Sequence, residues 1–303
     1  MRLAIRRFFM RILFLSCFAA IVLFGVAYRI FSKVTNRVFY EKRIKEKMES
    51  VRSRLKKMYN ASEVRFTTDD GLVIAGMLVV RENAQRNVII CHGYMGSKER
   101  MASFIDMFPR DNVLLFDFRA HGESEGNFIS IGYREQADVC AAVQFLQSNA
   151  QTKGLSICGL GISMGAASLI RAASEGAPFD ALVLDSSFAR LNDHVGESFA
   201  IRTGLPRFPF LSIMSYMFRW TSGFSIADVN PCDQIKKVAC PVFVIHAKDD
   251  EVIAVYHAHE IYNNAGSKKK LWLVDSKRHG YACSDCKEHY VRLANEFFAS
   301  AAA

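Results

Sequence analysis

The sequence predicts an α/β protein whose largely parallel sheet is covered by helices on both faces. Short apolar stretches typical of buried strands recur along the chain, near Val88, Val113, Leu155, Ala181, Val242 and Leu271. Helical stretches separate them, and strand–helix alternation is typical of parallel sheets. Half of the 303 residues are hydrophobic, which is enough material for one large core.

The first elements in chain order form a hairpin. Val64 to Phe66 and Leu72 to Val80 read as two strands that turn at Asp70-Gly71. Further along, residues 133 to 146 are predicted to form a helix with one apolar face, made by Val139, Ala142, Val143 and Leu146. These patterns place two antiparallel strands ahead of the alternating strand–helix part.

A Gly-x-Ser-x-Gly pentapeptide, Gly161 to Gly165, follows the strand at Leu155 to Gly159. The small-residue stretch after it, Met164 to Ala173, reads as a helix. A sharp turn between such a strand and helix lifts a serine hydroxyl above a sheet. Ser163 is therefore a candidate nucleophile, although the same pentapeptide also occurs as a plain turn.

Two more motifs follow predicted strands: His92-Gly93-Tyr94-Met95-Gly96 and Asp117 to Ser124. With the pentapeptide they resemble α/β-hydrolases, and most closely the membrane-anchored serine aminopeptidase-like or lysophospholipase-like hydrolases. The resemblance runs from about Val64 to Phe298. It implies an α/β-hydrolase fold with a mostly parallel eight-stranded sheet and a short helical lid at about 188–230, within a domain of residues 61–303.

The resemblance also implies the site residues. Ser163 would be the nucleophile, His279 the base and Asp250 the acid, because the family's acid follows the loop histidine, here His246, by four residues. The N–H groups of Tyr94 and Met164 would form the oxyanion hole. Ala247 and Ala254 depart from the family's usual Gly and Pro, and Asp249 is the neighbouring alternative to Asp250.

Three other residues are weighed against this assignment. Asp185, which ends the preceding strand, is the alternative acid. His92 and His121 are interpreted as structural residues of the site's floor. No metal or organic cofactor is needed for an acyl-enzyme mechanism.

The interval 188–230 suggests the substrate. It is rich in Phe, Met and Trp, including Phe218 and Trp220, and this composition favours an acyl or otherwise hydrophobic small-molecule substrate. We therefore expect a serine hydrolase that cleaves a carboxylic ester or thioester. A serine peptidase of the aminopeptidase type and a non-catalytic α/β-hydrolase-like binding protein are the alternatives.

The formal charge of +9 does not indicate nucleic-acid binding, because residues 1–57 hold 15 of the 39 basic residues and only 3 of the 30 acidic ones. Ile12 to Tyr28 is an uncharged stretch of 17 residues between Arg11 and Arg29. Its length suits a membrane span with snorkelling arginines. We expect an anchor at residues 1–31, with a cleaved signal peptide as the alternative.

A basic amphipathic stalk helix is expected at residues 32–60, with apolar positions at Tyr40, Ile44, Met48, Val51, Leu55 and Met58. Its basic face could meet an anionic membrane, or the helix could cover the globular domain. Four arginines precede the apolar stretch and seven Lys/Arg follow it within about twenty residues, which favours a cytosolic catalytic domain.

The eight cysteines show no disulfide framework spacing, and this favours a reducing compartment. Cys283 and Cys286 form a lone C-x-x-C near His279, which we interpret as a surface loop, with redox gating as a minor alternative. The oligomeric state and the identity of the substrate do not follow from the sequence.

Overall fold

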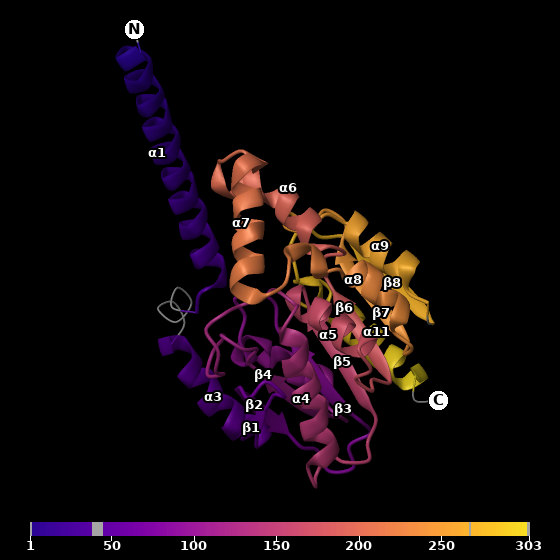
Figure 1. Cartoon of the computed structure of the whole chain (residues 1–303). Helices are drawn as coiled ribbons and strands as arrows, with labels where there is room; N and C mark the ends of the chain where they lie inside the picture. Colours follow the sequence, from indigo (N-terminus) through magenta and orange to yellow (C-terminus); the bar gives the residue numbers. More distant parts are fainter. Residues whose placement is uncertain (1, 38–44, 267, 302–303) are drawn as a thin grey trace. The chain divides into compact units, whose positions relative to one another are not determined.

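The computed structural model describes residues 2–37, 45–266 and 268–301. The chain forms two compact units. One consists of Met1–Thr35 and Asn192–Asp228, and the other of Asn36–Leu191 and Val229–Ala303. Figure 1 follows the chain through both units by colour.

The larger unit is built on an eight-stranded sheet in the order β1-β2-β4-β3-β5-β6-β7-β8. β1 pairs antiparallel with β2 and β2 antiparallel with β4, while all later pairs are parallel. The sheet confirms the predicted fold class, including the hairpin that turns at Asp70-Gly71. The strands are β1 Ser62–Thr67, β2 Val73–Val79, β3 Asn87–Cys91, β4 Asn112–Phe116, β5 Ile157–Ile162, β6 Ala181–Asp185, β7 Val242–Ala247 and β8 Lys269–Val274.

Helices cover both faces of this sheet. On one face, α4 (Glu135–Ser148), α5 (Met164–Ser174) and α9 (Tyr256–Asn264) pack on strand residues such as Ile89 and Leu182. On the other, η1 (Lys98–Met107), α3 (Lys45–Tyr59) and α11 (Lys287–Ala301) pack on residues such as Val88 and Val183. The apolar face predicted for α4 is buried in the first of these cores. Short segments α8 (Pro231–Gln234), η3 (Ile235–Lys237) and α10 (Ala282–Asp285) complete the unit.

The segment predicted as a stalk helix divides differently from the expected boundaries. α1 continues past residue 31 to Thr35, because Phe31 and Thr35 extend one buried face of that helix. α3 begins at Lys45 and buries Leu55 completely in the larger unit's core. Leu55 therefore packs on the globular domain, whereas Met58, another predicted apolar position, is exposed. Tyr40 and Ile44, two of the predicted apolar positions, lie outside the described residues.

The smaller unit contains α1 (Arg2–Thr35), most of α6 (Leu191–Thr203), α7 (Arg207–Ser222) and η2 (Ile226–Asp228). Within α1, Leu13–Thr35 is long and apolar enough to cross a membrane, a property that a signal sequence would share. Within this unit α7 packs along the carboxyl-terminal part of α1, where the rings of Phe31 and Phe218 meet edge to face at 6.1 Å.

Candidate active site

Ser163 occupies the turn between β5 and α5 in a strained backbone conformation. Its φ is 55° and its ψ is −115°, a region that non-glycine residues rarely adopt and that commonly marks functional turns. Neighbouring glycines permit the turn. A Cβ at Gly165 would lie 2.4 Å from the carbonyl oxygen of Cys91, and one at Gly161 would lie 2.6 Å from the Ala166 nitrogen. The backbone therefore makes a sharp, strained elbow between β5 and α5, with Ser163 half-buried at its tip.

The predicted base, His279, is hydrogen-bonded to the predicted acid, Asp250. The His279 Nδ1 lies 2.8 Å from Asp250 Oδ2, and the other oxygen of Asp250 accepts hydrogen bonds from the N–H groups of Val252 and Ile253 at 2.8 and 2.9 Å. Asp249, by contrast, is exposed. Because a carboxylate oxygen only accepts hydrogen bonds, Nδ1 of His279 must carry the proton that it donates to Asp250. The neutral ring therefore has its unprotonated nitrogen at Nε2.

The charge of Asp250 is stabilised where it lies. Burial alone would raise the pKa of this carboxyl, but hydrogen bonding to His279 and to two backbone N–H groups lowers the pKa below its ordinary value. The Asp250 side chain is completely buried, whereas that of His279 is 19% exposed. An ionised, buried acid beside a partly exposed imidazole can stabilise an imidazolium that forms during proton transfer.

The loop that carries His279 reaches the strand that carries Ser163. A Cβ at Gly280 would lie only 2.8 Å from Cγ2 of Ile162, the residue before Ser163. The Ser163 N–H in turn donates to the carbonyl oxygen of Asp185 at 2.8 Å. The carboxyl ends of the central strands β5 and β6 therefore meet the His279 loop.

Asp185 and Ser186 form a second polar pair behind this loop. The Ser186 hydroxyl donates to Asp185 Oδ1 at 2.8 Å and accepts the N–H of Gly280 at 3.2 Å. Burial raises the pKa of Asp185 to about 6, opposed by its bond to Ser186 and by the nearby His279. Asp185 is thus bonded to Ser186, whereas Asp250 is the carboxylate bonded to His279. No local pattern in the sequence indicates a role for Ser186, because its hydrogen bond to Gly280 joins residues 94 positions apart.

The positions expected for the oxyanion hole flank Ser163. A Cβ at Gly93 would lie 3.4 Å from Ser163 Cβ, so the turn that holds Gly93 and Tyr94 passes directly beside the serine. Met164 is the first residue of α5, and the first N–H groups of a helix have no partner within the helix. The backbone N–H of Met164 is therefore available at the helix end that favours negative charge.

The two histidines interpreted as structural, His92 and His121, have structural contacts. His92 donates from Nδ1 to the Gly93 oxygen at 2.8 Å and accepts the Phe118 N–H on Nε2 at 3.1 Å. Burial and the neighbouring His121 lower the pKa of His92 to about 3, so this ring is neutral and oriented. His121 is fully buried with Nδ1 2.8 Å from the Arg119 oxygen. Both histidines fit the structural interpretation.

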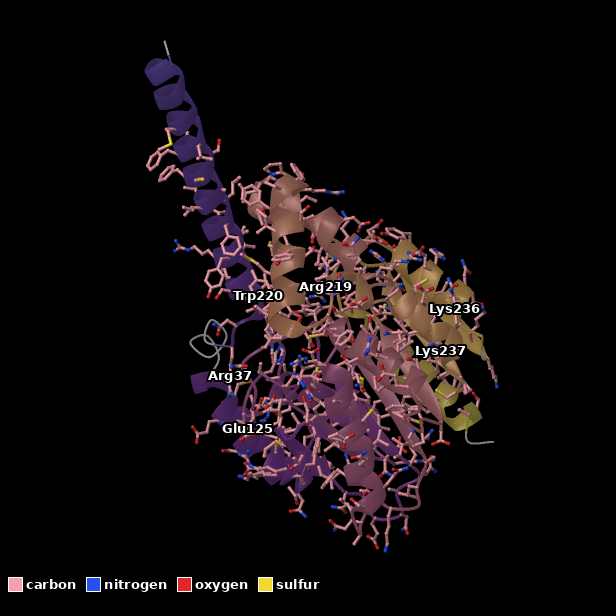
Figure 2. All side chains as sticks on the ribbon, in the orientation of Figure 1. Arg37, Glu125, Arg219, Trp220, Lys236 and Lys237 are labelled. Carbon is pink, nitrogen blue, oxygen red and sulfur yellow. The ribbon has the colours of Figure 1, made fainter. Side chains whose placement is uncertain are left out.

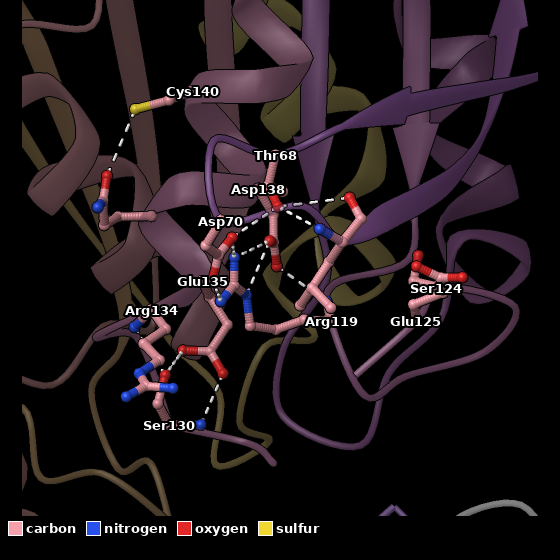
Figure 3. A network of polar contacts seen from close by, with 12 residues as sticks. Thr68, Asp70, Arg119, Ser124, Glu125, Ser130, Arg134, Glu135, Asp138 and Cys140 are labelled. Carbon is pink, nitrogen blue, oxygen red and sulfur yellow. Dashed lines mark hydrogen bonds and ion pairs between the residues drawn. The ribbon is translucent and has the colours of Figure 1, made fainter. Parts of the chain in front are cut away.

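Arg119 joins three elements through carboxylates. Figure 3 shows its guanidinium between Asp138 of α4 and Asp70 of the β1–β2 turn, at 2.8 and 2.7 Å. Hydrogen bonds from Arg119 and Thr68 help to hold the pKa of Asp70 at about 2. A buried guanidinium that is paired on both sides fixes the loop in place, and this loop carries His121 toward His92, with ring centroids 5.0 Å apart.

One cluster of carboxylates, formed by Glu99, Asp117 and Glu123, lies close enough together to suggest a cation site. The Lys98 ammonium occupies its centre, with Nζ 3.1, 2.6 and 2.9 Å from the three acids. Lys98 is almost completely buried, so this charge compensates the cluster inside the fold. The cluster is therefore an ion-pair network with a buried centre, and Glu123 forms its exposed end.

Cys283 and Cys286 lie on α10 and at its end. Both are free thiols in this structure. Burial and the nearby Asp185 raise the pKa of Cys283 to about 11, so its thiol stays protonated near neutral pH and reacts slowly. The interpretation as a surface loop is therefore wrong for Cys283, which lies on a short helix and is buried in the core, and its protonated thiol disfavours redox gating.

Comparisons with known proteins agree with this fold and site. The family described as "Serine aminopeptidase, S33" matches residues 82–225. The uncharacterised protein YqkD of Bacillus subtilis is 30% identical over 236 residues, which cover 75% of each chain. The chain therefore belongs to the α/β-hydrolase superfamily, as the sequence motifs predict.

Two similar proteins carry named activities. The esterase Pf2001 of Pyrococcus furiosus superimposes with a TM-score of 0.66 at 26% identity, covering 81% of this chain and 95% of the esterase. The lysophosphatidylserine lipase ABHD12 of Danio rerio is 28% identical over 168 residues, which are 53% of this chain and 41% of the lipase. The chain is thus similar to hydrolases of the esterase and lipase type.

Proposed function

We propose that this protein is a serine hydrolase that cleaves a carboxylic ester or thioester through an acyl-enzyme. One observation carries the proposal. His279, which is hydrogen-bonded to Asp250 at 2.8 Å, lies on a loop whose Gly280 approaches Ile162 at the end of β5, and Ser163 follows Ile162 in a strained turn. A nucleophile, a base oriented by an acid and two candidate oxyanion donors are the parts that acyl transfer requires.

In the proposed reaction Ser163 Oγ attacks the substrate carbonyl while His279 Nε2 takes its proton. Asp250 keeps Nδ1–H directed toward itself and stabilises the imidazolium. The N–H groups of Tyr94 and Met164 stabilise the oxyanion of the tetrahedral intermediate. His279 then protonates the leaving alcohol or thiol, and a water molecule activated by the same histidine hydrolyses the acyl-enzyme.

A lipid-like acyl group is the proposed substrate class. The insert between β6 and β7, which we take to be the lid, is rich in apolar residues, and the esterase and lipase activities of similar proteins point the same way. In addition, α1 is proposed to anchor the protein as a single membrane span, with the catalytic domain on the cytosolic side. The proposed boundaries are an anchor that ends near residue 31, a basic segment to residue 60 whose helix α3 packs on the hydrolase domain, and a hydrolase domain from 61 to 303.

The nucleophile is tested by Ser163→Ala with a fluorophosphonate probe. We expect the variant to lose probe labelling and to lose about a million-fold in ester turnover, as is typical when a triad nucleophile is removed. Ser168→Ala is the matched control, because Ser168 is a buried serine of α5 whose hydroxyl donates to the Met164 carbonyl oxygen at 2.8 Å. Equal labelling of both variants would reject Ser163 as the nucleophile.

A series of p-nitrophenyl esters tests the substrate class. Each methylene that enters an apolar pocket contributes about 0.8 kcal/mol, so kcat/KM should rise from acetyl to medium-chain esters. The serine aminopeptidase description of the matching family makes a peptidase the second candidate. Faster cleavage of aminoacyl amides, with a steady decrease beyond acetyl esters, would favour that candidate.

A further inference from the structure

The smaller unit exposes large apolar side chains that its own packing leaves uncovered. We call residues 192–228, with helices α6 and α7, the α6–α7 hairpin. Four large apolar residues of this hairpin are strongly exposed: Ile201, Phe208, Tyr216 and Trp220, at 87%, 79%, 68% and 78%. Elsewhere in the described part of the chain, leaving α1 aside, the exposed large apolar residues have smaller exposed fractions, of which the highest is 61% at Met58.

α7 has two distinct faces. Phe210, Met217 and Phe218 are buried, and Phe218 meets Phe31 of α1 and Phe224 edge to face at 6.1 and 5.0 Å. Ser212, Tyr216 and Trp220 recur every four residues on the exposed side, which places them along one stripe of the helix. Figure 2 labels Trp220 and Arg219 near the carboxyl end of α7. The exposed stripe is therefore not the surface that holds α7 to α1.

The charges of the hairpin match a lipid surface. Residues 208–218 contain no charged side chain, and exposed arginines stand at both ends of this stretch, Arg207 and Arg219, with Arg202 nearby on α6. Tyr and Trp are enriched where acyl chains meet headgroups, and arginine pairs with phosphate. The arginines also limit the depth of insertion, because a guanidinium is costly near the bilayer centre.

We propose that the α6–α7 hairpin binds the surface of an anionic lipid bilayer next to α1. Tyr216 and Trp220 lie at the boundary between headgroups and acyl chains, and Arg219, next to Trp220, pairs with lipid phosphates. The surface is continuous with the apolar surface of α1, since α7 and α1 pack directly on each other. The proposal goes beyond the hydrolase reaction and rests on the proposed membrane anchoring by α1.

The experiment uses the full chain in vesicles of phosphatidylcholine with phosphatidylglycerol. The chain has two tryptophans, so Trp272→Phe leaves Trp220 as the only one. We expect brominated lipids to quench Trp220 fluorescence, most strongly when the bromines lie near the headgroup end of the acyl chain. Trp220→Phe is the control, because Trp272 lies in β8 beside the rings of His289 and Tyr290 and should show little lipid quenching.

Activity assays separate this proposal from the proposed function. Tyr216→Glu, at the other aromatic position of the exposed stripe, should lower hydrolysis of an ester embedded in anionic vesicles several-fold while leaving a short soluble ester unaffected, and the loss should be smaller in pure phosphatidylcholine. If wild type cleaves neither ester, the hydrolase assignment fails. If the assignment holds but brominated lipids do not quench Trp220, the lipid-surface proposal is overturned. Cross-linking that joins the hairpin to a second copy of the chain through the Trp220 surface would overturn it as well.

Discussion

Asp249 and Asp250 are adjacent in the chain but differ in every contact that matters for chemistry. Asp250 is bonded to His279 and to two backbone N–H groups, whereas Asp249 faces solvent. If Asp250 holds the His279 tautomer, Asp250→Asn should lower kcat by roughly ten-thousand-fold, with KM little changed. Asp249→Asn is the matched control and should retain most activity. The reverse order of effects in steady-state ester assays would assign the acid to Asp249.

Ser186 should act as a positioning residue for the His279 loop. Its hydroxyl connects Asp185 to the N–H of Gly280, so Ser186→Ala leaves that N–H and the Asp185 carboxyl without their shared partner. We expect kcat to fall about ten-fold or more, KM to change little, and fluorophosphonate labelling to slow by a similar factor.

Ser187→Ala is the control for this prediction. Ser187 is equally buried in the same turn, but its hydroxyl bonds to the neighbouring Phe188 oxygen. A stability loss without a change in kcat for Ser186→Ala, measured alongside urea unfolding of both variants, would show that the Ser186 contact is structural only.

These residues also show what the sequence could and could not predict at this scale. Asp250 follows His246 by four positions in a loop with a recognisable pattern, so resemblance was enough to select it. Ser186 has no such pattern, because its importance comes from a hydrogen bond to a residue 94 positions away. Contacts between distant loops depend on how the sheet aligns its strand ends, and no local residue spacing records that.

The α3 helix is held to the larger unit by charge as well as by Leu55. Arg52 pairs with Glu123, whose other oxygen accepts a hydrogen bond from Lys98 at 2.9 Å. Burial would raise the pKa of Glu123, but the bonds from Lys98 and Arg52 lower it to about 2. Because the folded-state pKa lies below the ordinary value near 4.5, this stabilisation is present above that value and is lost as the pH falls toward 2.

Glu123→Gln should therefore weaken the acid dependence of stability. The variant should be less stable than wild type at pH 7, by about 1 kcal/mol or less for a partly exposed pair, and the difference should shrink as the pH falls from 5 to 2.5. Urea unfolding of the full chain measures both quantities. Glu288→Gln, at an exposed position of α11, is the control. A difference that stays constant with pH would contradict the ion-pair explanation.

At the level of elements, regular patterns were predictive and irregular ones were not. The strands and α4 and α5 follow from apolar runs and periodicity, which is why their positions agree with the structure. The burial or exposure of each apolar residue in α7 does not follow from these patterns. Phe218 and Trp220 stand two residues apart with the same apolar character, yet one packs on Phe31 and the other is 78% exposed. That difference arises only when α7 and α1 are packed together.

For the whole molecule, the N-terminal part is strongly basic and the remainder is slightly acidic. Residues 1–57 carry 15 basic residues against 3 acidic ones, and the rest of the chain carries 24 against 27. The excess positive charge therefore flanks the one described helix that is long and apolar enough to span a membrane. This distribution suits attachment to an anionic leaflet and leaves the hydrolase domain without a strong field of its own.

Membrane attachment through α1 predicts that the full chain stays with the membrane pellet in alkaline carbonate. A retained hydrophobic span resists this treatment, whereas proteins held by charge alone are released. Deleting residues 1–31 should release the protein into carbonate, but the α6–α7 hairpin should leave weak binding to anionic vesicles that increases as salt is lowered. Sequencing the amino terminus of the full-length protein is the deciding control, because a mature terminus near Tyr28 would make the apolar stretch a cleaved signal peptide and remove the anchor altogether.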